Sequence, residues 1–121
     1  MNKDIIKPTI LVCSNGIQSW HLDGKLHRED GPAIIRPDGS QEWWLHGQLH
    51  REDGPAIIHP DGSQYWYLHG QLHREDGPAI INPDGYQAWY LHDVQVSAEE
   101  VFSKMTKEQK MKAIFNLDEW R

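Results

Sequence analysis

The residues that could do chemistry in this 121-residue chain are concentrated in one peptide, Leu-His-Arg-Glu-Asp-Gly-Pro-Ala-Ile-Ile, which begins at Leu26, Leu49 and Leu72. Each copy places a histidine and two carboxylic acids within four residues. These side chains serve in general acid–base catalysis and in metal binding. The peptide is therefore either a functional site that occurs three times or a structural unit of the fold.

The spacing of the copies argues against a shared metal ion. Protein ligands must converge to about 2.0–2.2 Å from one zinc ion, whereas equivalent residues of successive two-strand repeats are expected about 10 Å apart. His27, His50 and His73 therefore cannot share an ion, although a local site such as His50 with Glu52 stays open. We predict no metal and no cofactor.

The repetition also argues against an enzyme. Catalytic acids and bases need an asymmetric pocket that gives them different pKa values, and three copies of one tetrapeptide form a ladder instead. The sequence has no nucleophile elbow, phosphate-binding loop or zinc-binding helix motif. We predict a protein without catalytic activity.

Composition limits the classes of partner and the cellular compartments that we expect for this protein. The formal net charge is −6 and no run of Lys and Arg is present, which disfavours direct binding of nucleic acid or membrane and favours a protein with a basic surface. A single cysteine, Cys13, excludes an intramolecular disulfide framework. The apolar run near the N-terminus is too short for a signal peptide or a membrane span, so we expect a cytoplasmic protein.

The central part of the chain has an internal period of 23 residues. Residues 20–42, 43–65 and 66–88 agree at 17 of 23 columns. A fixed period of this length is typical of repeat architectures, in which each unit is one small piece of supersecondary structure.

Each repeat carries two turn signals. The first is a two-residue loop ending in glycine, and the second is Pro-Asp-Gly; both favour tight hairpins. The loops are Asp23-Gly24, His46-Gly47 and His69-Gly70, and the Pro-Asp-Gly turns begin at Pro37, Pro60 and Pro83. Two reversals per repeat predict an antiparallel meander in which the Gly-Pro of the repeated peptide bends the second strand. Trp43 and Leu45 share a face by alternation, and we expect this Trp-x-Leu face to be the core.

The repeat unit, aromatic-x-x-Gly-x-Leu-His-Arg-Glu-x-Gly-Pro-Ala followed by Asp-Gly and Trp, resembles a variant of the MORN repeat seen in bacterial and bacteriophage proteins. The resemblance covers about residues 16–96. It implies a mainly β fold, a single-layer antiparallel β-hairpin solenoid. It also implies binding, usually of protein and sometimes of lipid, rather than catalysis.

The ends of the chain are predicted to be caps. Residues 1–19 form an N-terminal half-repeat, residues 20–96 form three hairpin repeats with a partial fourth, and residues 97–121 form a short helical cap. Ser97 and Thr106 are capping-box residues that predict two helix starts. In the second helix Met111, Ile114 and Phe115 share one face, which we expect to pack, with Leu117 and Trp120 closing onto the last hairpin.

Two surfaces are candidate binding sites. Aromatic residues in the columns that vary between repeats predict an exposed stripe of Trp44, Tyr67, Tyr86 and Tyr90, flanked by His46 and His69. The alternative, an aromatic ladder that only stabilises the sheet, stays open. The second surface is an acidic edge of Glu29, Asp30, Glu52, Asp53, Glu75 and Asp76.

We therefore expect a non-enzymatic protein-binding repeat module. Since the unit resembles phage repeats, its specific form is a phage-encoded inhibitor of a host defence or nucleic-acid-handling protein, similar to an anti-CRISPR, in the host cytoplasm. Two alternatives remain open: sequestration of a small ligand or metal ion, and self-assembly into a homo-oligomer through an imperfectly capped end.

Overall fold

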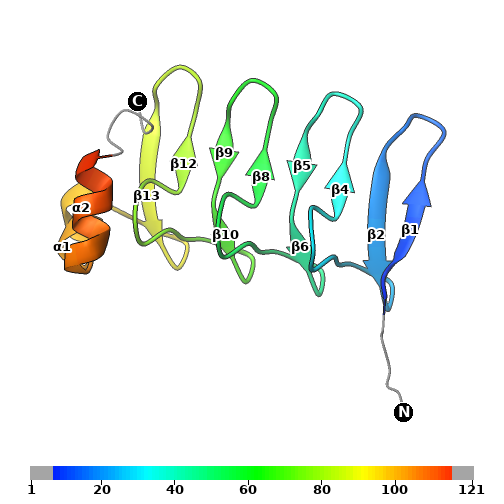
Figure 1. Cartoon of the computed structure of the whole chain (residues 1–121), viewed down its shortest axis with the longest axis horizontal. Coiled ribbons are helices and arrows are strands. Elements are labelled where there is room, and N and C mark those ends of the chain that lie inside the picture. The colour runs from blue at the N-terminus through cyan, green and yellow to red at the C-terminus, as the bar shows by residue number, and fades with distance from the viewer. Residues whose placement is uncertain (1–6, 116–121) are drawn as a thin grey trace, which may run out of the picture.

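The computed structural model describes residues 7–115 and shows a mainly β chain that ends in two short helices (Figure 1). The strands are β1 (Thr9–Val12), β2 (Gln18–Leu22), β3 (Lys25–Leu26), β4 (Ile34–Ile35), β5 (Gln41–Glu42), β6 (Trp44–Leu45), β7 (Gln48–Leu49), β8 (Ile57–Ile58), β9 (Gln64–Tyr65), β10 (Tyr67–Leu68), β11 (Gln71–Leu72), β12 (Ile80–Ile81), β13 (Gln87–Leu91) and β14 (Val94–Val96). The helices are α1 (Ala98–Ser103) and α2 (Lys107–Phe115).

One antiparallel sheet connects the repeats in the order β1-β2-β4-β5-β8-β9-β12-β13-β14. Glu42 in β5 pairs with Ile34 of its own repeat and with Ile57 of the next one, so the ladder crosses the repeat boundary. Each full repeat adds a small lower hairpin, such as β6 with β7. Figure 1 shows these hairpins side by side along the molecule, with the helices beyond β13.

Both predicted turns are confirmed. In the lower turn His46 and Gly47 have φ values of 51° and 79°, the left-handed pair that a type I′ hairpin needs. In the upper turn Gly39 has φ 94°, and the Arg36 N–H donates to the Ser40 carbonyl at 3.0 Å. The Gly-Pro segment does more than bend a strand, because it separates β3 from β4 completely.

The prediction that the Trp-x-Leu face forms the core is wrong. Trp43 and Leu45 are only half-buried, whereas Ala33, Ala56 and Ala79 are completely buried. The reason is that, within residues 7–115, no second layer covers Trp43, so side chains of its own and neighbouring repeats shield it. The buried residues of the repeats are mostly small or polar: these alanines, Ala88, Ser19, Ser40, Ser63, His27, His50 and His73.

The C-terminal helices begin where the sequence predicts. The Ser97 hydroxyl accepts the Glu100 N–H at 3.1 Å, and Thr106 and Gln109 form a reciprocal capping box with bonds of 2.9 and 3.1 Å. No helix among residues 7–115 is long and apolar enough to cross a membrane.

The packing face of α2 differs from the prediction. Ala113 is buried beside Val101 and Met105, while Met111 and Ile114 are 58% and 59% exposed. The short turn between the helices sets the rotation of α2, and the side that meets the last hairpin is not its most apolar side. The side chain of Phe115, and all of Leu117 and Trp120, lie outside the described part of the chain.

Candidate functional site: the acidic edge and the clefts between repeats

The histidine of each repeated peptide is buried and holds the next repeat in place. His27, His50 and His73 are 2%, 7% and 4% exposed. The Nδ1 atom of each accepts a 2.9 Å hydrogen bond from a backbone N–H in the next lower turn. The donors are His46, His69 and His92. With Nδ1 used as the acceptor, Nε2 is the ring nitrogen left to face another group.

The Nε2 atom of each buried histidine faces the glutamate two residues later. The distance between Nε2 and the carboxylate is 3.1 Å for His73 and Glu75 and 3.5 Å in the two preceding repeats. The turn histidine lies against the buried ring, with centroids 4.3–4.5 Å apart. The contact with the histidine Nε2 thus orients the glutamate side chain in each repeat.

The arginine of each repeated peptide binds groups within its own loop. The Arg51 guanidinium lies 3.8 Å from the centre of the Trp43 ring, and its Nε and Nη1 donate to the Asp53 carboxylate at 3.2 Å and the Pro55 carbonyl at 3.1 Å. The other two repeats have the same contacts. The arginine therefore combines two interactions: its guanidinium stacks on an aromatic ring and donates hydrogen bonds in its own plane. Each arginine thus pairs with the aspartate of its own repeat.

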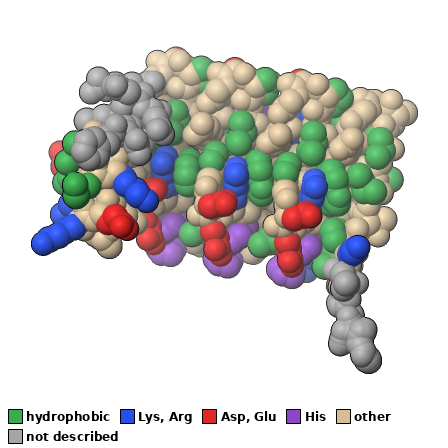
Figure 2. All heavy atoms as spheres, viewed as in Figure 1, with side chains coloured by type: hydrophobic (Ala, Val, Ile, Leu, Met, Phe, Trp, Pro, Cys, Tyr) green, Lys and Arg blue, Asp and Glu red, His purple; other side chains and the backbone are tan. Residues whose placement is uncertain are grey.

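These contacts leave a row of exposed carboxylates, the acidic edge. The glutamates are 80%, 83% and 69% exposed and the aspartates 86%, 89% and 53%, in chain order. Figure 2 shows the acids gathered beside the histidines and arginines at successive repeats. Because two strands separate equivalent positions, the acidic pairs are spaced about 10 Å apart. The acidic edge comprises Glu29, Asp30, Glu52, Asp53, Glu75 and Asp76.

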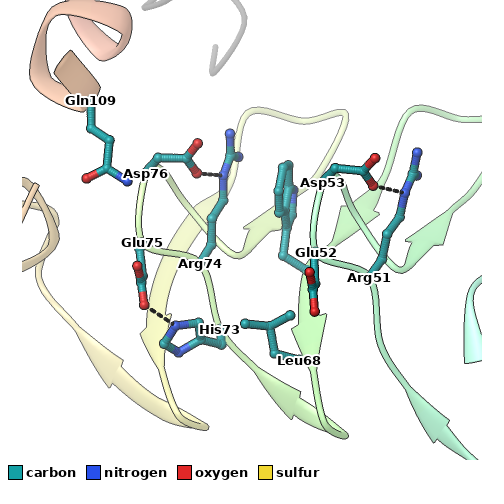
Figure 3. Close-up of a pocket in the computed structure, with 10 residues that line it drawn as sticks. Arg51, Glu52, Asp53, Leu68, His73, Arg74, Glu75, Asp76 and Gln109 are labelled. Atoms are coloured by element: carbon teal, nitrogen blue, oxygen red, sulfur yellow. Dashed lines mark hydrogen bonds and ion pairs between the residues drawn. The ribbon is translucent and has the colours of Figure 1, made fainter. Parts of the chain in front are cut away.

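A cleft lies between the acids of consecutive repeats. One cleft of about 280 Å³ is lined by Trp66 and Leu68, with acids of both adjoining repeats around it and Gln109 of α2 at one side. Figure 3 shows Asp53 and Asp76 each bonded to the arginine of its own repeat, Arg51 and Arg74. A second cleft of the same kind lies one repeat earlier and is lined by Trp43 and Leu45. Each cleft combines an apolar wall with a carboxylate rim.

The structure places only some residues of the predicted aromatic stripe next to one another. Trp44, Tyr67 and Tyr90 occupy equivalent places in successive repeats but are half-buried. Tyr86 is 51% exposed and lies at an upper turn, where its carbonyl accepts the Asn82 N–H. Tyr86 therefore stands apart from the other three.

The half-buried aromatic residues already have protein partners. The Trp44 indole donates to the Glu42 carboxylate at 2.8 Å. Burial raises the pKa of the Tyr67 phenol, and the nearby Asp93 carboxylate adds to the effect. The flanking His46 and His69 are exposed but pack on the buried rings. This face is closer to a stabilising ladder than to an open contact surface.

Metal-ligating side chains do not converge in the described part of the chain. No group of three or more His, Cys, Asp or Glu residues there is placed to hold an ion. The local candidate, His50 with Glu52, has its two side chains 3.5 Å apart, and the Nδ1 of His50 is already used by a backbone N–H.

Sequence reasoning missed the role of the buried histidines. The signal that could have found it is a constant separation, because the donor follows the buried histidine by 19 residues in all three bonds. The period of 23 hides this separation, since the bond joins different columns of adjacent repeats.

No family model, curated protein or solved structure matches this chain. The function therefore has to be argued from the geometry of the acidic edge and the clefts.

Proposed function

We propose that this protein is a non-enzymatic binding module whose acidic edge docks on the basic surface of a protein partner. The observation that carries the proposal is the row of exposed carboxylates repeated at a constant spacing on a rigid sheet. Complementary charge steers association and fixes the register between partners.

The carboxylates are held in place before any partner arrives. Asp53 is bonded to Arg51, which is fixed in turn by Trp43 and the Pro55 carbonyl. A preorganised group loses less conformational entropy on binding than a free side chain does. The exposed fraction of the Asp53 side chain is still 89%, so most of its surface remains available.

The clefts fit a long cationic side chain. Arg and Lys lay their aliphatic stems along apolar surface and keep their charged ends in polar surroundings. The stem would lie on Trp66 and Leu68, and the charge would meet the carboxylates of Glu52 and Glu75 at the rim.

The spacing predicts a sequence pattern in the partner. An extended chain advances about 3.3 Å per residue, so three residues span about 10 Å, the spacing of the acidic pairs. A segment with a cationic residue at every third position would place one charge in each cleft. This pattern is the recognition element we propose.

The same proposal includes a broader identity: a MORN-like solenoid that acts in the cytoplasm as a phage-encoded inhibitor of a host nucleic-acid-handling protein. Its support is the resemblance of the repeat, the net charge of −6 and the position of the acids on one edge. A row of carboxylates can occupy a basic groove that otherwise holds a phosphate backbone. Competition between this protein and nucleic acid for a purified basic nuclease tests that identity.

The experiment for the binding mode uses two peptides of equal composition, one with arginine at every third position and one with the arginines contiguous. Isothermal titration calorimetry is expected to show tighter binding of the spaced peptide, weakening as salt is raised. The E52Q/E75Q double variant is expected to lose about tenfold in affinity for the spaced peptide.

The matched control is E99Q/E108Q, which removes the same charge from exposed positions of the helical cap. It should bind the spaced peptide like the parent. Equal affinity for the two peptides, or equal losses in the two double variants, would show that only net charge matters and would overturn the proposed site.

A further inference from the structure

The first strand of the sheet has a free side. Leu11 and Val12 in β1 precede Ile34 and Ile35 in β4 by 23 residues, so β1 occupies the position that β4 has in a full repeat. In the interior, β4 pairs with β2 and β5, and β8 pairs with β5 and β9. Among the described residues β1 pairs with β2 alone. The interface that joins the repeats is therefore unfilled at this end.

The free strand is apolar, and Lys7 and Pro8 lie before it rather than within it. Ile10, Leu11 and Val12 are 49%, 54% and 60% exposed, whereas Ile34 and Ile35 are half-buried. Natural edge strands are usually blocked by a charge, a proline or a bulge, and Thr9–Val12 contains none of these.

Along β1, the backbone N–H and C=O groups alternate between facing β2 and facing the free side. The Cys13 N–H donates to the Ile17 carbonyl at 2.9 Å, so by alternation Leu11 also directs its backbone bonds toward β2. Ile10 and Val12 then direct their N–H and C=O groups outward. In the next repeat the residue equivalent to Ile10 is Ala33, whose carbonyl accepts the Trp20 N–H at 2.9 Å across the repeat boundary. The Ala33 N–H instead donates to Glu42, because β4 begins only at Ile34, whereas β1 pairs regularly with β2 from Thr9 on.

The opposite end of the sheet carries the helical cap. There β14 pairs with the lower part of β13, and α1 packs on the same strand. Apolar side chains of the cap close this end: Val101, Met105 and Ala113 against Trp89, Leu91 and Val96. Because this cap packs where a further repeat would stack, we take a contact between two identical N-terminal ends, which closes with twofold symmetry, as the mode of association.

We infer that β1 is a self-association edge on which a second copy of this chain pairs antiparallel about a twofold axis normal to the sheet. Leu11 lies opposite its own counterpart, and Ile10 lies opposite Val12 of the other copy. This register joins the outward backbone groups in hydrogen-bonded pairs and places apolar side chains opposite each other on both faces. Because only one short strand is buried and each copy carries a charge of −6, the dimer is weak.

Sedimentation velocity over a concentration series tests the inference. The parent is expected to shift from monomer to dimer as concentration rises. L11K places two ammonium groups opposite each other at the centre of the contact and should stay monomeric. The matched control V94K changes an equally exposed valine at the capped end, 62% exposed, and should dimerise like the parent. A parent that is monomeric at every concentration, or equal loss of dimer in both variants, overturns the inference.

Two measurements on the parent remain decisive even if L11K fails to fold. Amide hydrogen exchange at Ile10 and Val12 should slow with rising concentration, while Leu11 should not change, because its N–H already faces β2. A nitroxide on the exposed Cys13 should report a short distance between copies, since this register separates the two backbones by about 14 Å. Uniform protection of all three amides, or a long distance between the labels, contradicts the proposed pairing.

Discussion

The Nδ1 atom of His50 accepts a 2.9 Å hydrogen bond from the backbone N–H of His69, across the boundary between two repeats. His69 is a turn residue with φ 50°, so the bond fixes the part of the hairpin that is least favourable for a side chain. The other ring nitrogen of His50 lies 3.5 Å from Glu52. One buried ring thus sets both the position of the next turn and the direction of an exposed acid.

Removing this ring should destabilise the fold. H50A leaves the N–H of His69 without its acceptor and opens a cavity at a buried position. We expect the free energy of unfolding to fall by about 2–4 kcal/mol. Urea denaturation followed by tryptophan fluorescence measures the change.

His59 provides the comparison. It is half-buried, and its ring Nδ1 lies 3.5 Å from the Ser40 hydroxyl, a much longer contact than the one His50 makes. H59A should cost less than about 1 kcal/mol. Similar losses in H50A and H59A would mean that the cross-repeat bond contributes little.

A second prediction concerns Gly54 and the arginine that closes its loop. A Cβ at Gly54 would lie 2.8 Å from the guanidinium carbon of Arg51, although the backbone of Gly54 is not in the left-handed region. G54A should therefore displace Arg51 from Trp43, Asp53 and the Pro55 carbonyl and lower the stability by about 1–3 kcal/mol.

A double-mutant cycle isolates this effect. In an R51A background the added methyl group has no guanidinium to displace, so G54A should cost much less there. G31A, where the same contact is 3.1 Å, should have a milder effect than G54A. Additive losses from R51A and G54A would contradict the steric explanation.

The parts of the fold that depend on short segments could be predicted from the sequence. Gly39 and Gly47 marked the hairpin turns, and Ser97 marked a helix start, because each acts through its own backbone and near neighbours. The core could not be predicted in this way. The burial of Ala33 and the half-exposure of Trp43 depend on how the repeats cover one another, which alternation within one strand does not contain.

The same distinction between local and long-range contacts applies to the candidate site. The pairing of Arg51 with Asp53 joins residues two apart, so it depends on one short peptide alone. The contact of Trp44 with Glu42 was not expected, although it also joins residues two apart, because it depends on which face of the sheet stays open. The exposure of Ile114 was misjudged for a related reason, since helix docking is a tertiary effect.

Acid stability should depend on the upper turns. The Ser63 backbone N–H donates to the Asp61 carboxylate at 2.9 Å and holds the pKa of Asp61 below its ordinary value of 3.8. A lowered pKa stabilises the folded state above pH 3.8, and this contribution is lost as pH falls through the folded value. D61N keeps an uncharged acceptor, so its thermal midpoint should fall less steeply between about pH 5 and pH 2. An unchanged slope, equal to that of the E108Q control, would show that Asp61 does not contribute.

Alkaline stability should depend on Tyr67. Burial, with Asp93, Tyr65 and Tyr90 adding to it, raises the pKa of the Tyr67 phenol above 10.0. An unfolded chain ionises this phenol more easily than the folded protein does, so the stabilising contribution is complete below pH 10.0 and is lost as pH rises through the folded value.

Y67F removes the ionisable group, so urea midpoints measured from about pH 8 to pH 11 should decline less in this variant than in the parent. Y86F changes a phenol that is 51% exposed and should leave the decline as it is in the parent. If the two variants behave alike, the lower hairpins leave Tyr67 as accessible as Tyr86. The aromatic residues of those hairpins would then be open to a partner, and the acidic edge would have to share the binding role.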